Sequence, residues 1–275
     1  NDHLVHLLKY DSVHGRLNAD VSLEGDVMKV ADQEIRLTAI RDPQDLPWSD
    51  VDVAYECTGI FTAKDKAELL LKSGAKRVLV SAPGANADKT IVFGVNDDTL
   101  TADDIIVSNA SCTTNCLAPV AKVLDDTFGI KTGYMTTIHA YTGDQPTHDT
   151  NHKDLYRARA AALSMIPTST GAARAISLVL PHLKGKLEGS AIRVPTANVS
   201  MVDLVINTNK PATIDAINDA LKAAAEGPLK GVLGYEEAPL VSADFNHDPH
   251  SSVFAPAPTS VTEDGLLRVV HGYDT

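Results

Sequence analysis

The spacing of apolar and polar positions changes near the middle of the chain. In the first 110 residues, short apolar runs such as Val51–Cys57 and Val78–Val80 alternate with a helical pattern. Short apolar strands separated by helices are typical of a parallel sheet that is covered on both faces. Residues 21–40 carry alternating apolar positions instead, and these predict a small hairpin excursion.

The helix between the two apolar runs has recognisable signals at both ends. Thr62 and Asp65 have the spacing of a capping box, which predicts the start of the helix. Ala67 and Leu70 lie on its apolar face, and Gly74 is a stop signal at its end.

The second half has longer strands of alternating pattern. They cover Tyr134–Ile138, Ala191–Val194 and Val199–Ile206, and a helical pattern covers Ala172–Leu180. A further helix begins at Thr213. Strands with helices beside them favour an α+β arrangement.

We therefore predict an α/β protein with two parts. Residues 1–110 form a doubly wound parallel sheet, and residues 111–275 form an α+β domain with a large, mostly antiparallel sheet. Parallel sheets bind ligands at the carboxyl ends of their strands, which Thr58-Gly59 and Ser81–Gly84 occupy here. Small residues there let a cofactor approach the backbone, although the same residue types also mark ordinary turns.

Charge and cysteine usage narrow the class of protein. The net charge is −12, so neither nucleic acid nor an anionic membrane surface is an expected partner. No apolar run reaches the length of about 20 residues that spans a membrane. Three cysteines provide no disulfide framework, which favours a reducing compartment such as the cytoplasm.

The candidate nucleophile is Cys112, in the segment Ser111–Cys116. An apolar strand pattern precedes this segment and a helical pattern follows it. Unpaired N–H groups and the positive end of a helix dipole favour a thiolate at such a junction. Cys116 lies one turn further on and is expected to be a buried structural thiol, with trapping of oxidised Cys112 as a minor alternative. Cys57, inside an apolar run, is expected to lie in the core.

His139 is the second candidate catalytic residue. A strand pattern delivers it to the polar turn Tyr141–Gln145. An imidazole beside a thiol can take its proton and later act as a general acid or base. A single histidine can equally be a structural residue, and the sequence alone does not show that the two side chains meet.

Two further features suggest that an anion binds. Pro167–Arg174 contains three consecutive hydroxyl residues and a glycine at a helix start, which is an anion site or simple N-capping by Thr170. Arg193 interrupts a strand, so it forms an internal ion pair or binds a carboxylate or phosphate. No histidine or cysteine spacing is that of a zinc site, so no metal is expected.

Together these motifs resemble the phosphorylating glyceraldehyde-3-phosphate dehydrogenase family, of bacterial type. The hexapeptide around Cys112 is the most specific match. Similar segments run along nearly the whole chain: Leu7–Gly15, Glu56–Gly59, Ser81–Pro83, Ser111–Cys116, His139–Gln145, Ile166–Ala173 and Arg193–Asp203.

The resemblance implies a role for each of these residues. Cys112 attacks the aldehyde of glyceraldehyde 3-phosphate, and His139 activates the thiol. Inorganic phosphate cleaves the resulting thioester to give 1,3-bisphosphoglycerate. The positions that match phosphate-binding residues are Ser111, Thr113, Thr142, Thr170, Gly171 and Arg193.

The resemblance also implies a cofactor and an assembly. Residues 1–110 form a truncated Rossmann domain in which Arg41 and Ser81 match cofactor contacts, and residues 111–275 form the catalytic domain. NAD is the first choice and NADP stays open, since Thr150-Asn151 stands where many NAD-specific members have Leu-Pro. Residues 143–165 match a loop that packs near a neighbouring subunit's cofactor in a homotetramer. The comparison further suggests a fragment that lacks both termini of the family.

Three rival functions are considered. Erythrose-4-phosphate dehydrogenase shares the chemistry, and Asp244–Ser251 resembles that enzyme. The turn Ala140–Gly143 favours the glyceraldehyde-3-phosphate enzyme instead. A non-catalytic interaction protein would have no need of a poised thiol, and a cofactor-free thiol hydrolase is the third rival.

Overall fold

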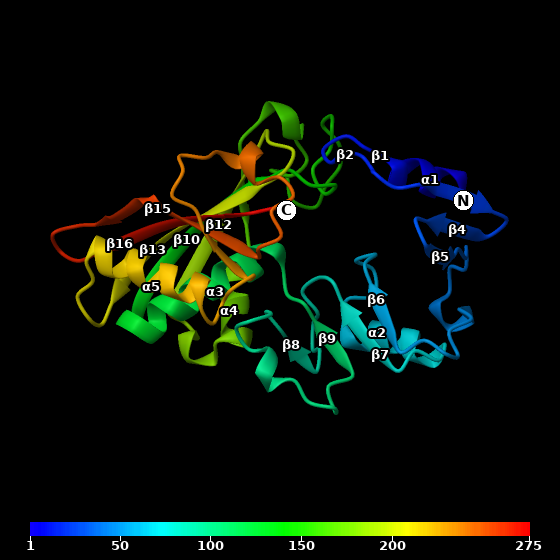
Figure 1. Cartoon of the computed structure of the whole chain (residues 1–275), viewed down its shortest axis with the longest axis horizontal. Coiled ribbons are helices and arrows are strands. Elements are labelled where there is room, and N and C mark those ends of the chain that lie inside the picture. The colour runs from blue at the N-terminus through cyan, green and yellow to red at the C-terminus, as the bar shows by residue number, and fades with distance from the viewer.

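The computed structural model describes all residues from 1 to 275. Two larger bodies, each built on one sheet, follow a smaller N-terminal unit (Figure 1). In the N-terminal unit, three strands form an antiparallel sheet in the order β3-β4-β5. The small hairpin predicted within residues 21–40 is therefore confirmed, and a third strand extends it. The elements of this unit are α1 (Asp2–Lys9), β1 (Tyr10–Asp11), β2 (Gly15–Arg16), β3 (Val21–Glu24), β4 (Val27–Val30) and β5 (Gln33–Arg36).

The first body is a four-stranded sheet in which every pair of neighbouring strands is parallel, in the order β6-β7-β9-β8. Its small core joins Ala67 and Leu70 of the helix to apolar strand residues such as Val78 and Val80. Its elements are η1 (Pro43–Asp45), β6 (Val53–Glu56), α2 (Lys64–Lys72), β7 (Arg77–Val80), β8 (Lys89–Thr90), η2 (Asp97–Thr99) and β9 (Ile106–Ser108).

Two local predictions in this body are wrong. The helix α2 begins one residue later than the capping box predicts, with Ala63 as its N-cap and no side-chain cap. The reason is tertiary, because the N–H of Lys64 donates to the carbonyl of Ala85. Cys57 is exposed rather than in the core, since strand β6 already ends at Glu56.

The second body is a seven-stranded sheet in the order β11-β12-β10-β13-β16-β15-β14. Four of its six strand pairs are antiparallel, so the predicted α/β class with a mostly antiparallel second sheet is confirmed. Its elements are α3 (Cys112–Phe128), β10 (Ile130–Ala140), η3 (Ala161–Leu163), β11 (Ile166–Ser169), α4 (Ala172–Val179), η4 (Pro181–Leu183), β12 (Leu187–Val194), β13 (Ser200–Thr208), α5 (Ile214–Glu226), β14 (Leu233–Tyr235), η5 (Ser242–Phe245), β15 (Ser252–Val261) and β16 (Leu267–Tyr273).

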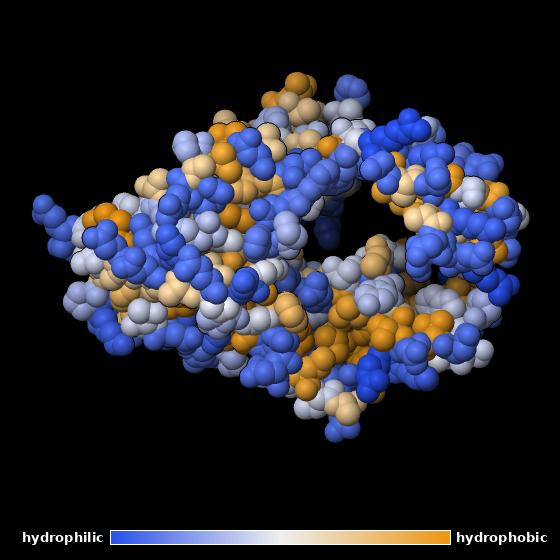
Figure 2. All heavy atoms as spheres, in the orientation of Figure 1, coloured by the Kyte–Doolittle hydropathy of each residue, from blue (hydrophilic) through white to orange (hydrophobic).

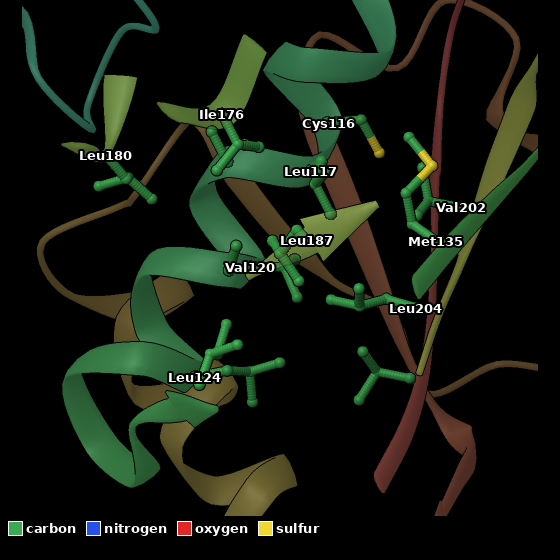
Figure 3. Close-up of a cluster of buried hydrophobic side chains, with 14 of the residues drawn as sticks. Cys116, Leu117, Val120, Leu124, Met135, Ile176, Leu180, Leu187, Val202 and Leu204 are labelled. Carbon is green, nitrogen blue, oxygen red and sulfur yellow. The ribbon is translucent and has the colours of Figure 1, made fainter. Parts of the chain in front are cut away.

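Helix α3 is the most deeply buried helix of this body. Leu117, Val120 and Leu124 are fully buried and lie in one cluster with apolar residues of the sheet such as Met135 and Leu204 (Figure 3). Burying a leucine or valine side chain contributes about 1.5–3 kcal/mol, so this contact holds the helix firmly. The start of α3 is therefore a rigid support for any side chain that it carries.

The surface shows how the parts of the molecule are arranged. Figure 2 shows an opening that the N-terminal unit, the first body and the second body surround. The ring closes where Nδ1 of His14 lies 2.7 Å from Nε2 of His247, between segments far apart in the sequence. No helix has the combination of length and apolar character that crossing a membrane requires.

Candidate active site

The sequence places Cys112 at the first position of α3 through a tight turn after β9. Ala110 adopts a φ of 58°, which is uncommon for a residue with a side chain. Ser111 then caps the helix, because its hydroxyl accepts from the N–H of Thr114 at 3.1 Å. The Cys112 side chain is exposed at this helix start, where backbone N–H groups lack intrahelical partners.

Strand β10 brings His139 to the same point. Nε2 of His139 lies 3.5 Å from Sγ of Cys112. Nδ1 lies 2.7 Å from the carbonyl of Ala140 and donates to it, which leaves the lone pair of Nε2 facing the thiol. Burial first, and then the neighbouring charge of Arg193, together lower the pKa of His139 to about 4. The imidazole is therefore neutral at pH 7 and can accept the proton of Cys112.

Arg193 is adjacent to His139 because of strand register. In the parallel pair β10–β12, His139 is directly opposite Arg193. One guanidinium nitrogen, Nη1, donates to the carbonyl of Ala140 at 3.0 Å, whereas the buried Nε has no partner within the protein. A guanidinium with an unused buried donor beside a cavity suits a phosphate oxygen.

One cavity of about 220 Å³ joins most of the predicted site residues. It contains both catalytic candidates, Cys112 and His139. It is also lined by five of the six predicted phosphate-binding residues, which are Ser111, Thr113, Thr170, Gly171 and Arg193. Thr142 is the sixth and lies beside the lining, where its hydroxyl accepts from Nη1 of Arg193 at 3.4 Å.

Two of the hydroxyl residues in this lining have contacts that qualify their role. The hydroxyl of Thr170 accepts from the N–H of Ala172 at 3.2 Å, so it supports the start of α4 while facing the cavity. The N-cap of α4 is Gly171 rather than Thr170. The hydroxyl of Thr113 is buried and lies 2.6 Å from that of Tyr273. Thr113 is therefore suited to present its backbone N–H, at a helix start, to an anion.

Two family models match the chain, one on either side of residues 65–110. Residues 111–275 match the family model "Glyceraldehyde 3-phosphate dehydrogenase, C-terminal domain", and residues 1–64 match "Glyceraldehyde 3-phosphate dehydrogenase, NAD binding domain". The chain belongs to the glyceraldehyde-3-phosphate dehydrogenase family. The resemblance seen in the segment Ser111–Cys116 is thereby confirmed.

Several bacterial members of this family are closely similar to the chain. The glyceraldehyde-3-phosphate dehydrogenase of Cereibacter sphaeroides is 64% identical over 269 residues, and that of Xanthobacter flavus is 59% identical over 271 residues. Each match covers 98% of this chain and 81% of the relative. Glyceraldehyde-3-phosphate dehydrogenase 1 of Bacillus cereus is 57% identical, with 98% of this chain and 82% of the relative covered.

Two residues at or behind the cavity were not predicted from the sequence. Arg157 lines the cavity and is held by Asp144, whose carboxylate accepts from Nη1 at 2.6 Å. The unusual length of the segment 143–165 was the available signal, because long connections in compact domains are often functional. Tyr273 is buried behind the site, with its ring edge-on to that of His139 at 5.9 Å between centroids. No local sequence pattern predicts this contact, because Tyr273 and His139 are far apart in the chain.

The two predicted cofactor contacts belong to the first body but do not line the same cavity. Ser81 follows β7, and its hydroxyl donates to the carbonyl of Glu56 at 3.0 Å. Arg41 lines a separate cavity of about 240 Å³ together with Trp48, Glu56 and Thr58. This mostly apolar cavity with an arginine at its edge suits a flat heterocycle such as the adenine of a dinucleotide. No group of three or more histidine, cysteine or acidic side chains is arranged to hold a metal ion.

Proposed function

We propose that the protein oxidises D-glyceraldehyde 3-phosphate to 1,3-bisphosphoglycerate, with NAD as the hydride acceptor and inorganic phosphate as co-substrate. The observation that carries the proposal is the approach of Cys112 Sγ to His139 Nε2, 3.5 Å apart. The two atoms meet in a cavity that also contains Arg193. A nucleophile, a neutral base and an anion-binding cation in one cavity are what oxidation of a phosphorylated aldehyde requires.

The chemistry begins at the thiol. As the sulfur of Cys112 attacks the aldehyde carbon, its proton passes to Nε2 of His139 and from there to the aldehyde oxygen, which becomes the hydroxyl of the thiohemiacetal. A dinucleotide held by the first body, with Arg41 and Ser81 among its contacts, would supply the acceptor for the hydride that the substrate carbon loses. The carbon then remains bound to Cys112 as a thioester, and His139 holds the hydroxyl proton released in oxidation. Attack of inorganic phosphate on the thioester releases the product and restores the Cys112 sulfur.

The phosphate groups need local positive charge, because the chain as a whole carries a net charge of −12. Arg193 supplies that charge, and burial keeps its interaction with an anion strong. Backbone N–H groups at the start of α4, near Gly171, and at the start of α3, near Thr113, can also donate to phosphate oxygens. Ser111, Thr142 and Thr170 add hydroxyl groups that can donate to phosphate oxygens.

The cofactor assignment concerns first the class of cofactor and then the choice between NAD and NADP. The match to an NAD-binding domain over residues 1–64 supports a nicotinamide dinucleotide. We assign NAD as the preferred form and leave NADP open, with Arg41 and Ser81 among its contacts. Direct binding measurements with the two dinucleotides distinguish the assignments.

We also propose that the enzyme acts as a cytoplasmic homotetramer. Support comes from large apolar side chains on the segment 143–165 and its neighbourhood. Leu155, Leu163 and Met165 are 81%, 83% and 75% exposed. Large apolar side chains exposed to this extent along one segment are typical of a surface that a partner covers. Sedimentation at micromolar concentration tests the assembly, and a monomer there contradicts it.

Substrate choice is tested by comparing two aldehydes. Purified protein is assayed for NADH formation with glyceraldehyde 3-phosphate and with erythrose 4-phosphate, with and without inorganic phosphate. We expect the higher kcat/KM for glyceraldehyde 3-phosphate and an absolute need for Cys112, shown by Cys112→Ser. A higher kcat/KM for erythrose 4-phosphate contradicts the assignment.

A further inference from the structure

A second pair of cysteine and histidine side chains lies behind the active site. The inner face of strand β16 presents Leu267, Val269, His271 and Tyr273 toward the core, all of them buried. The first two are apolar, as the core position predicts. His271 and Tyr273 carry polar groups, so the inner face of the strand changes from apolar to polar toward the start of α3.

His271 makes its contacts entirely within the protein interior. Its Nδ1 lies 3.0 Å from Sγ of Cys116 and 3.0 Å from Oγ of Ser252, and all three side chains are fully buried. The other ring nitrogen, Nε2, is buried and has no partner. Orphaned buried N–H groups are rarer than orphaned acceptors, so the proton belongs on Nδ1, which donates to this pair.

These contacts tie two successive turns of α3 to a single strand. Thr113, in the first turn, is bonded to the hydroxyl of Tyr273. Cys116, in the second turn, points from the helix toward the sheet (Figure 3) and meets His271. Cys112 lies one turn before Cys116 on the same side of the helix. Its sulfur is already 3.5 Å from Nε2 of His139, so a small shift of the helix would separate the pair.

We propose that His271 is a positioning residue for Cys112: by holding Cys116 and the second turn of α3 against β16, it fixes the sulfur of Cys112 in reach of His139. The proposal rests on the proposed function only in taking Cys112 as the nucleophile. Misplacing a nucleophile by about 1 Å can cost on the order of 100-fold in rate, so such an anchor is of catalytic value. Burial also lowers the pKa of His271 to about 3 and raises the pKa of Cys116, so both stay neutral.

The test separates the hydrogen bond from the packing. His271→Leu fills the site without a polar group, whereas His271→Asn can place an amide N–H near the position of Nδ1. Val269→Ala is the matched control, because Val269 is a buried neighbour on the same face of β16. For each protein, the rate of Cys112 alkylation by iodoacetamide is followed across pH by peptide mass spectrometry, and the thermal midpoint is recorded.

We expect His271→Leu to slow Cys112 alkylation about 10-fold and His271→Asn to restore most of the rate. Val269→Ala should lower the thermal midpoint and leave the rate unchanged. In steady-state assays, the loss in His271→Leu should be mainly in kcat, with a smaller change in KM for the aldehyde, because Arg193 and the start of α4 have no contact with His271. Cys116→Ala removes the same anchor from the other side, so the double variant should be no slower than either single variant.

The outcomes are decisive in both directions. Unchanged alkylation in both His271→Leu and Cys116→Ala overturns the proposal, as does a rate in His271→Asn as low as in His271→Leu. If His271→Leu fails to fold, Cys116→Ala and His271→Asn decide by the same criteria. If Cys112 of the wild-type protein reacts no faster than the exposed Cys57, the proposed function itself fails. If Cys112 reacts faster but the variants leave its rate unchanged, only the proposal for His271 fails.

Discussion

The hydroxyl of Tyr273 lies 2.6 Å from Oγ1 of Thr113 and so joins the last strand to the residue that follows the nucleophile. The same hydroxyl is 3.1 Å from Oγ1 of Thr137 on β10. Burial raises the pKa of Tyr273, so the phenol stays protonated and can donate to one threonine while accepting from the other. Three elements that frame the active site thus meet at a single oxygen atom.

Removing that oxygen should destabilise the protein. In Tyr273→Phe, the buried hydroxyls of Thr113 and Thr137 lose their common partner, which costs about 1–3 kcal/mol for a buried unsatisfied group. Urea unfolding measures the change. Tyr134→Phe is the matched control, because Tyr134 is half-exposed on β10, and it should change the free energy of unfolding by less than about 0.5 kcal/mol. Equal effects of the two substitutions would show that the Tyr273 hydroxyl is not a structural junction.

Most of the fold could be predicted because its signals are local. Alternating residues marked β10, β12 and β13, and Thr213 marked the start of α5 by accepting from the N–H of Ala216. Cys57 could not be placed in this way. The apolar run ends early because the buried carboxylate of Glu56 accepts from the N–H groups of Thr58 and Gly59, which turns the chain and exposes the thiol.

The chemistry-bearing residues of the site could be proposed from the sequence, but their meeting could not. His139 and Arg193 are neighbours through strand register, which no local pattern encodes. The contact between Thr113 and Tyr273 spans 160 positions. Arg157 lies in a segment without clear periodicity, so only the length of that segment indicated a function there.

Stability should fall on acidification because His139 is buried in its neutral form. Its pKa in the folded protein is about 4, below the ordinary value of 6.5, so between these pH values the unfolded chain binds a proton that the folded chain does not. Stability present above pH 6.5 is therefore lost as the pH falls toward 4, by up to about 3 kcal/mol from this group. His139→Asn should lose correspondingly less. Urea unfolding at pH 7.5 and pH 4.5 checks this, and equal losses in the two proteins contradict it.

Arg193 should be needed for the phosphorylated substrate. Arg193→Gln removes a charge-assisted contact worth about 1.5–3 kcal/mol, so KM for the aldehyde should rise roughly 10- to 100-fold. Arg174→Gln is the control, since Arg174 is exposed on α4 and outside the cavity, and its KM should be unchanged. Steady-state kinetics decide, and a similar KM in both variants would remove Arg193 from the binding site.

Alkylation should distinguish Cys112 from the other exposed thiol. Both Cys112 and Cys57 are exposed, but only Cys112 has an imidazole nitrogen at 3.5 Å. Iodoacetamide at pH 7 should therefore modify Cys112 faster, and His139→Asn should slow it by about 100-fold or more, as expected for loss of a general base. His182→Asn, a change at an exposed histidine paired with Asp125, serves as the control. Equal labelling of the two thiols would contradict activation by His139.

The central claim is that Cys112 becomes acylated by the aldehyde before phosphate enters the reaction. Stopped-flow absorbance in the absence of phosphate tests it most directly, with protein, NAD and glyceraldehyde 3-phosphate mixed at comparable concentrations. The account predicts a rapid burst of NADH that stops near one equivalent per site, resumes as steady turnover when phosphate is added, and is absent in Cys112→Ser. Continuous turnover without phosphate, or a burst that survives in Cys112→Ser, would contradict it.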